Sequence, residues 1–121
     1  MDTERTDTRS ILDRQYEAFG AGSADDVIKD FAEDAVLIRA DTVFEGRASI
    51  HAAYSEMFAG RFKPGAYEFT LDAEHVIGDI AYIAWRASCA TDEVTLGADT
   101  FVVRDGKIVA QTYTAKIEPK P

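Results

Sequence analysis

The chain is poor in several residue types, and each scarcity excludes a class of protein. A single cysteine, Cys89, excludes an intramolecular disulfide. The two histidines, His51 and His75, lie far apart and in no ligand spacing, so the sequence predicts no metal site and no cofactor. No window approaches the ~20 apolar residues of a membrane span, and residues 1–5 lack the basic-then-apolar order of a secretory signal. A cytoplasmic location is therefore expected.

Basic residues are also few. The chain of 121 residues has 13 Lys and Arg against 22 Asp and Glu, a formal net charge of −9, and the basic residues are scattered. Phosphate backbones and anionic lipid surfaces attract clustered positive charge, so neither a nucleic acid nor a membrane is expected as a partner. The length suits one core, and 46% of the residues are hydrophobic. We therefore expect a single domain over residues 1–121.

Hydrophobic residues change their spacing once along the chain. Helical spacing in the first half gives way to alternation in the second, which predicts an α+β fold. A helix with one apolar stripe is expected over residues 7–19, and Ser23 is a typical N-cap for a second, short helix. A strand is expected over residues 35–38, and a third helix follows the segment 45–47. These helices need a sheet on which to pack.

The second half predicts antiparallel strands whose register follows from their turns. Apolar side chains alternate with acidic and polar ones over residues 67–75. Gly78-Asp79 is a typical two-residue hairpin turn. That turn would set His75 opposite Tyr82, and counting back along both strands it would direct Arg86 inward.

An acidic side chain, Asp99, is also expected to face inward. It lies on the strand that precedes the Asp105-Gly106 turn, and a turn near Asp92-Glu93 would place it opposite Arg86. A carboxylate directed into the interior costs free energy unless it is paired, protonated or used. Asp99 and Arg86 are therefore either candidate catalytic residues or a structural ion pair. Tyr16 on the first helix is a third candidate, because a buried phenol needs a partner and Asp99 could be that partner.

The opposite face of these strands is predicted to be apolar as well. An antiparallel sheet with two apolar faces needs cover on both, and the helices can cover only one. We therefore expect a homodimer through this convex face, with Trp85 near its centre. The residues expected on that face are Ile83, Trp85, Ala87, Leu96 and Val102. The alternative is a turn count that is wrong by one, which would direct Trp85 to the interior.

Aromatic and polar side chains on the inward face predict a hydrophobic pocket for a modest, partly apolar ligand. The candidate ligand-binding residues are Gln15, Tyr54, Phe58, Phe69, His75, Tyr82, Phe101, Gln111 and Tyr113. His75 is either a general base or a hydrogen-bonded core residue. Gln111 and Tyr113 face the pocket if residues 104–106 form a three-residue turn with a bulge, whereas a two-residue turn would send them to the dimer face.

Three motifs carry a family resemblance. They are the expected end of the second helix at residues 31–36 (FAEDAV), the entry to the third helix at 45–50 (EGRASI), and residues 99–108 (DTFVVRDGKI). Together they resemble the nuclear transport factor 2-like superfamily, in particular its SnoaL-like and ketosteroid-isomerase-like members. The resemblance spans nearly the entire chain. It implies a conical fold in which a curved, mixed, mostly antiparallel sheet packs around three N-terminal helices and a pocket, usually as a dimer.

The resemblance to ketosteroid isomerases implies roles for particular residues. Asp99 falls where those enzymes keep a protonated aspartic acid, and Tyr16 or Gln15 falls near their oxyanion tyrosine. Arg39 occupies the position of their proton-abstracting aspartate. Because a guanidinium cannot remove a proton from carbon at neutral pH, steroid isomerisation by that mechanism is disfavoured.

Other members of the superfamily narrow the chemistry further. Arg86 resembles the arginine of limonene epoxide hydrolases, but Ser88 and Tyr113 replace the two aspartates that activate water there, so epoxide hydrolysis is disfavoured. Asp99 resembles a proposed acid and base of SnoaL-like polyketide cyclases. Two hypotheses therefore remain. The chain is an enzyme of isomerase, cyclase or lyase type that uses Asp99 for proton transfer, or it is a non-catalytic binding or dimerising module whose Arg86 and Asp99 form a structural pair.

Overall fold

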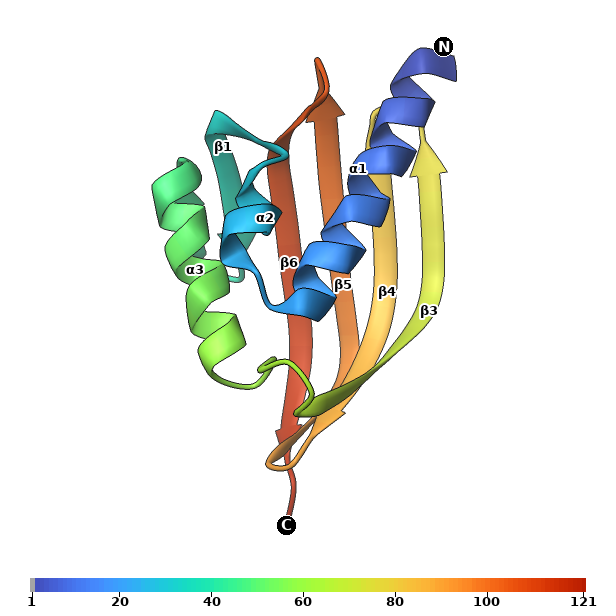
Figure 1. Cartoon of the computed structure of the whole chain (residues 1–121). Helices are drawn as coiled ribbons and strands as arrows, with labels where there is room; N and C mark the ends of the chain where they lie inside the picture. Colours follow the sequence, from blue (N-terminus) through green and yellow to red (C-terminus); the bar gives the residue numbers. More distant parts are fainter. Residues whose placement is uncertain (1) are drawn as a thin grey trace.

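The computed structural model describes the backbone of residues 2–121 and the side chains of residues 7–121 (Figure 1). Within that range the chain forms three helices, α1 (Asp2–Ala21), α2 (Ala24–Ile28) and α3 (Arg47–Ala59). It also forms six strands, β1 (Phe31–Arg39), β2 (Thr42–Glu45), β3 (Tyr67–Ile77), β4 (Ile80–Cys89), β5 (Asp92–Arg104) and β6 (Lys107–Pro119). Met1, on which part of the secretory-signal prediction depends, lies outside the described residues.

One mixed sheet holds the described strands in the order β2-β1-β6-β5-β4-β3. β1 and β6 are parallel, and every other neighbouring pair is antiparallel. β2 and β3 form free edges, so the sheet does not close. The helices lie on one side of it, with α1 against β3, β4 and β5 and α3 against β1 and β2 (Figure 1). The predicted α+β class and mixed, mostly antiparallel sheet are confirmed.

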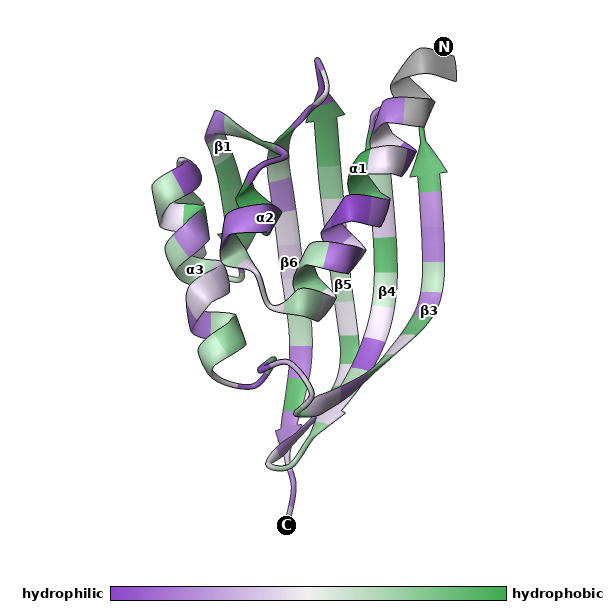
Figure 2. Ribbon diagram, in the orientation of Figure 1, coloured by the Kyte–Doolittle hydropathy of each residue, from purple (hydrophilic) through white to green (hydrophobic). Residues whose placement is uncertain are grey.

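The helices occur where the sequence predicts them, although their ends differ. α1 begins at Asp2, before the predicted start, and ends ahead of Gly22, which has a φ of 67°. Figure 2 shows hydrophilic residues along much of α1, as expected for a helix that buries one stripe. The hydroxyl of Ser23 accepts a hydrogen bond from the backbone N–H of Asp26 at 3.1 Å, so Ser23 is the predicted N-cap of α2.

The motif at residues 31–36 is a strand, and its assignment to the end of a helix is wrong. α2 ends at Ile28, and β1 begins at Phe31. The backbone of this segment pairs in parallel with β6, beginning with Phe31 opposite Ile108, and both side chains are buried. Tertiary pairing therefore overrides the local helical pattern. The chain then returns through β2, which the sequence analysis did not predict.

A bulge in β3 changes which of its side chains face the helices. The Gly78-Asp79 turn sets His75 opposite Tyr82, as predicted. Asp72, however, is an extra residue without a partner on β4, and one extra residue reverses the faces of a strand. His75 and Tyr82 consequently lie on the outer face of the sheet, the face that the helices leave uncovered, with their rings 6.2 Å apart. Their predicted positions in the pocket are wrong.

The face predicted for β4 is reversed in the same way. Ile83, Trp85 and Ala87 are buried on the helix side of the sheet, with Trp85 only 5% exposed. They therefore do not belong to the outer face, where a dimer interface was predicted. Leu96 is 56% exposed and Val102 is half-buried on the outer face, as expected. The alternative in which Trp85 faces the interior is the observed one.

Arg86 does not face Asp99. Its guanidinium lies on the outer face and makes two hydrogen bonds of 2.8 Å to the carboxylate of Asp72, the bulged residue of β3. The β4–β5 turn lies before Asp92, not at Asp92-Glu93, and β5 carries a bulge at Thr95. Ile83 rather than Arg86 is consequently the cross-strand partner of Asp99. The predicted Arg86–Asp99 pair is wrong. The shifted turn and the bulge together move the register by an odd number of residues, and an odd shift places Arg86 and Asp99 on opposite faces of the sheet.

The turn between β5 and β6 has two residues, Asp105 and Gly106, with positive φ values of 51° and 74°. Such a turn was predicted to send Gln111 and Tyr113 to the outer face. Val109, however, is an extra residue on β6 and forms a bulge beside the turn. Gln111 and Tyr113 therefore face the helices and are buried.

Gly97 gives the indole ring of Trp85 the room that it occupies. The two residues are cross-strand partners, and a Cβ atom at position 97 would overlap the ring. The indole stacks on Tyr113, with ring centroids 6.2 Å apart, and on Phe69, with centroids 5.5 Å apart. Gly97 thus fixes where the largest aromatic ring of the interior lies.

Gly97→Ala is expected to lower the free energy of unfolding by about 2 kcal/mol, because the added methyl group overpacks the interior. Urea titration followed by the fluorescence of Trp85, the one tryptophan of the chain, measures the change. Gly20→Ala is the matched control: it lies in α1, where the added Cβ would meet no atom within 4 Å apart from its chain neighbours and the backbone of its own helix, and it should stabilise the helix slightly. Equal stability of Gly97→Ala and wild type would contradict the close packing.

Candidate functional site

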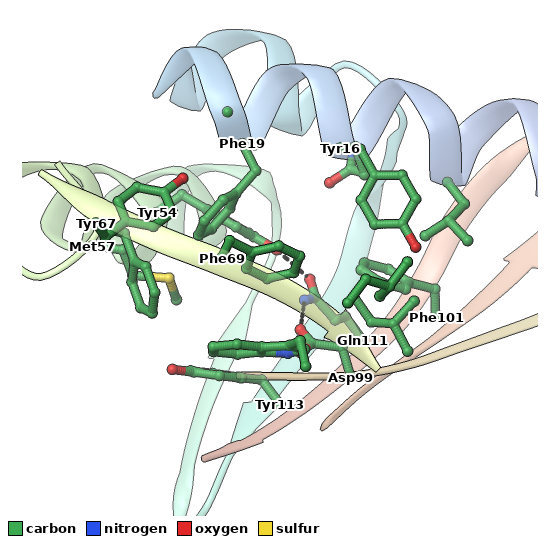
Figure 3. A pocket seen from close by; sticks show the side chains of 17 residues that line it. Tyr16, Phe19, Tyr54, Met57, Tyr67, Phe69, Asp99, Phe101, Gln111 and Tyr113 are labelled. Carbon is green, nitrogen blue, oxygen red and sulfur yellow. Dashed lines mark hydrogen bonds between the residues drawn. The ribbon is translucent and has the colours of Figure 1, made fainter. Parts of the chain in front are cut away.

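A cavity of about 390 Å³ lies between the helices and the sheet (Figure 3). Its walls are mostly aromatic and aliphatic. The lining residues are Leu12, Gln15, Tyr16, Phe19, Gly20, Tyr54, Met57, Phe62, Tyr67, Phe69, Leu71, Ile83, Trp85, Asp99, Phe101, Gln111 and Tyr113. Asp99 is the only charged residue in this set. We call this space the inner cavity.

The carboxyl group of Asp99 is almost fully buried and is held by two neutral donors. The indole N–H of Trp85 donates to Oδ1 at 2.7 Å, and the amide of Gln111 donates to Oδ2 at 2.9 Å. Burial raises the pKa of Asp99 to about 6, and the two hydrogen bonds oppose that rise. No Lys or Arg with a described side chain forms an ion pair with it. Asp99 is therefore a carboxyl group that can change its protonation state near neutral pH.

A second hydrogen bond extends this arrangement across the cavity. The hydroxyl of Tyr54 on α3 donates to Oε1 of Gln111 at 2.7 Å, so Gln111 accepts from the phenol and donates to Asp99 (Figure 3). Burial is the main reason that the pKa of Tyr54 is raised, with the charge of Asp99 acting in the same direction. Tyr54 therefore stays protonated and orients the amide of Gln111, which in turn orients the carboxyl group.

Tyr16 lines the inner cavity but is not bonded to Asp99. Its hydroxyl donates to Glu74 at 2.5 Å, and Glu74 also accepts a hydrogen bond of 2.6 Å from Arg9. Burial and this bond raise the pKa of Tyr16, while the hydrogen bond from Arg9 is the main cause of the lowered pKa of Glu74. The prediction that Asp99 is the partner of Tyr16 is wrong, because the bulge at Asp72 directs Glu74 toward α1.

The structure brings together most, but not all, of the candidate residues. Those that line the inner cavity are Tyr16, Asp99, Gln15, Tyr54, Phe69, Phe101, Gln111 and Tyr113. Phe58 is buried in the core behind the wall, against Phe19 and Tyr54. Arg86, His75 and Tyr82 lie on the outer face. Gln15 is held in place by its amide, which donates to the carbonyl oxygen of Val27 at 2.9 Å.

Trp85 is the most important residue that the sequence analysis misplaced. It supplies one of the two donors to Asp99, and it was expected on the opposite face. The signal that could have revealed it is Gly97, because a glycine in the middle of a strand indicates close approach of another group. Cavity residues from α1 and the segment after α3, such as Phe19 and Phe62, carry no comparable signal.

Within the described residues, no group of three or more His, Cys, Asp or Glu side chains could hold a metal ion. The same part of the chain contains no helix with the length and apolarity needed to cross a bilayer.

The arrangement of helices and sheet defines the class of protein, the NTF2-like fold. An NTF2-like protein of unknown function from Mesorhizobium loti is 24% identical, with a TM-score of 0.79 and coverage of 93% of each chain. A protein from Jannaschia sp. assigned as a SnoaL-like polyketide cyclase is 19% identical, with a TM-score of 0.77 and coverage of 92% of this chain and 86% of that one. A protein from Kribbella flavida assigned as a ketosteroid isomerase is 17% identical, with a TM-score of 0.76 and coverage of 96% and 82%.

Sequence comparison identifies the family. The profile of the SnoaL-like domain matches residues 12–111, so the chain belongs to the SnoaL-like domain family. The predicted resemblance to SnoaL-like proteins is confirmed, and the fold is the NTF2-like fold that this resemblance implies. Among curated proteins, none matches this chain in sequence.

The burial of Asp99 predicts how stability depends on pH. Because its pKa is about 6 in the folded protein and 3.8 as the ordinary value, the unfolded chain binds fewer protons between these limits. The free energy of unfolding of wild type, minus that of Asp99→Asn, should therefore fall by about 2 kcal/mol from about pH 4 to pH 7. Urea titrations of both proteins across this range measure the difference.

Asp72→Asn is the control for that experiment. Its hydrogen bond to Arg86 lowers the pKa of Asp72 from 3.8, so its contribution to stability is present above that pH and is lost only below it. The corresponding difference for Asp72→Asn should stay constant from about pH 4 to pH 7. A constant difference for Asp99→Asn as well would mean that the carboxyl group is not desolvated.

Proposed function

We propose that this SnoaL-like domain binds a modest, partly apolar molecule in the inner cavity and that Asp99 transfers a proton to or from it, in a reaction of isomerase or cyclase type. The observation that carries the proposal is a lone buried carboxyl group, with a pKa of about 6, in a cavity whose other walls are uncharged. The resemblance to structures assigned as a polyketide cyclase and a ketosteroid isomerase supports the reaction class.

The hydrogen bonds of Asp99 leave it able to react. Each of its oxygens accepts one bond from the protein, and a carboxylate oxygen can accept two. At neutral pH the group is mainly ionised, so it can remove a proton from a carbon next to a carbonyl group. The electron pair of that C–H bond forms a C=C bond, and the π pair of the C=O bond moves onto the carbonyl oxygen to give an enolate. The protonated Asp99 then returns the proton to the same or another carbon.

Asp99→Asn is expected to slow such a proton transfer by at least about 100-fold, because an amide cannot accept a proton from carbon. The probe is β-tetralone, a bicyclic aromatic ketone with acidic C–H groups. Proton NMR in D₂O measures how fast the protein exchanges these protons beyond the buffer rate. Fluorescence of Trp85, in the cavity wall, reports binding of the same probe independently.

Arg86→Met is the control variant, because it removes a charge on the outer face and should leave the exchange rate unchanged. Equal exchange by wild type and Asp99→Asn would rule out proton transfer by Asp99. If the probe also quenched the fluorescence of Trp85 in both proteins, the alternative of a non-catalytic binding module would be favoured.

We also propose that the protein forms a homodimer through the outer face of the sheet. With Ile83, Trp85 and Ala87 inside, this face carries other apolar side chains. Exposed on it are Ile80 (45%), Tyr82 (36%) and Leu96 (56%). The helices lie on the opposite side and cannot cover these side chains. A second copy would present the same apolar face and is the simplest cover.

Leu96→Arg is expected to shift a dimer to monomer, because a two-fold interface would receive the added charge twice. Sedimentation equilibrium measures the association. Ala52→Arg introduces the same charged side chain at an exposed position of α3 and should have no effect. A monomeric wild-type protein at micromolar concentration would refute the proposed dimer.

A further inference from the structure

A second cavity adjoins the first. It has a volume of about 720 Å³ and lies where the end of α3, the end of β1 and the β4–β5 turn approach one another. Met57, Phe62 and Tyr113 line both cavities, so these three side chains form the partition between them. We call this space the outer cavity. Its lining is much more polar than that of the inner cavity and includes two arginines, Arg39 and Arg61.

Arg39 is available to a ligand. It is the last residue of β1, it is half-buried, and its guanidinium lies 5.1 Å from the ring centroid of Phe44. Among the side chains that the structure describes, no carboxylate forms an ion pair with Arg39 and no acceptor hydrogen-bonds to it. A half-buried guanidinium with only an aromatic neighbour retains all five of its N–H donors for an anion.

Arg61 is partly available. Its Nε lies 3.3 Å from Oδ2 of Asp92, and the same oxygen accepts a hydrogen bond of 2.8 Å from the hydroxyl of Thr91. Within the described part of the chain its two terminal nitrogens make no hydrogen bond. The other acidic residue of the outer cavity, Glu56, is exposed on α3. The terminal N–H groups of Arg61 are therefore free to bind an anion alongside Arg39.

Tyr113 connects the arginines to the inner cavity. Its ring stacks on Trp85 at an interplanar angle of 13°, and Figure 3 shows its hydroxyl pointing away from Asp99. Among the described residues this hydroxyl has no hydrogen-bond partner. Burial raises the pKa of Tyr113, and the charges of Arg61 and Arg39 oppose that rise, so both cations act on the phenol. The partition thus presents one free O–H donor at a cavity that two arginines also line.

We propose that the outer cavity binds the carboxylate of a ligand whose apolar ring lies in the inner cavity, with Arg39, Arg61 and the hydroxyl of Tyr113 as its binding residues. The substrate class is then an aromatic or alicyclic carboxylic acid that carries a carbonyl group near Asp99. This inference rests on the proposed function, because it assumes that the inner cavity holds the apolar part. A chain with a net charge of −9 repels anions, so local arginines are needed to bind one.

The test compares two probes of nearly equal shape, phenylbutyrate and its primary amide, phenylbutyramide. Quenching of the fluorescence of Trp85 and isothermal titration calorimetry measure the dissociation constants. The acid should bind at least about tenfold more tightly than the amide, the effect of a charge-assisted hydrogen bond. Arg39→Met and Arg61→Met should each weaken binding of the acid about tenfold while leaving the amide unaffected.

Two further variants make the result specific. Arg104→Met removes the same charge from an exposed position near the β5–β6 turn, away from both cavities, and should change neither constant. Arg61→Lys keeps the charge and should retain most of the affinity for the acid, which separates a binding role from a structural one. If a variant binds the amide as tightly as wild type does, its inner cavity is correctly folded.

The outcomes separate this inference from the function on which it rests. Equal affinity of wild type for acid and amide would overturn the carboxylate site and leave the inner cavity intact as an apolar site. An acid preference that survives in both methionine variants would also overturn the assignment of Arg39 and Arg61. Binding of neither probe would contradict the apolar inner cavity, and with it the proposed function.

Discussion

The hydrogen bond from the indole of Trp85 to Asp99 is the interaction on which the site depends. It joins β4 to β5 inside the sheet, and it requires Gly97, because a side chain there would occupy the space of the ring. The same indole forms a wall of the inner cavity and stacks on Tyr113, which borders the outer cavity. One side chain therefore supports the carboxyl group, the apolar walls and the partition between the two cavities.

The protonation state of Asp99 results from two opposing effects, of which burial is the larger. Burial alone would raise the pKa further and favour the protonated form, which can accept no proton. A buried arginine beside it would keep the group ionised and would lower its basicity. Two neutral donors, Trp85 and Gln111, give an intermediate result, a pKa of about 6. This value lies near the operating pH, where a group can act first as a base and then as an acid.

The sequence was sufficient to predict the three helices, most of the strands, the Gly78-Asp79 hairpin and the inward position of Asp99, because each depends on local signals. It was insufficient for the faces of β3 and β4. The bulges at Asp72 and Thr95 each add one residue to a strand, and an added residue reverses every side chain beyond it. No residue type is required at such a position, so the pattern of apolar residues alone could not reveal them. The pattern of apolar residues does not reveal the bulge at Val109 either. Because of this bulge, Gln111 and Tyr113 face the helices although the turn has two residues.

The position of Arg86 rules out the predicted ion pair with Asp99. The bulge in β3 reverses the faces predicted for β4. It also places the carboxylate of Asp72 on the outer face, where this carboxylate binds Arg86 through two hydrogen bonds. Arg86 is thereby kept out of the interior by a partner of its own. An arginine facing Asp99 would have made the carboxyl group half of an ion pair, satisfied and unavailable to a ligand. Because the bulge places that cation on the outer face, Asp99 has only neutral hydrogen-bond donors, and it lines the inner cavity. A buried carboxyl group without a counter-ion destabilises the fold when it ionises, and the proton transfer proposed above would account for keeping one.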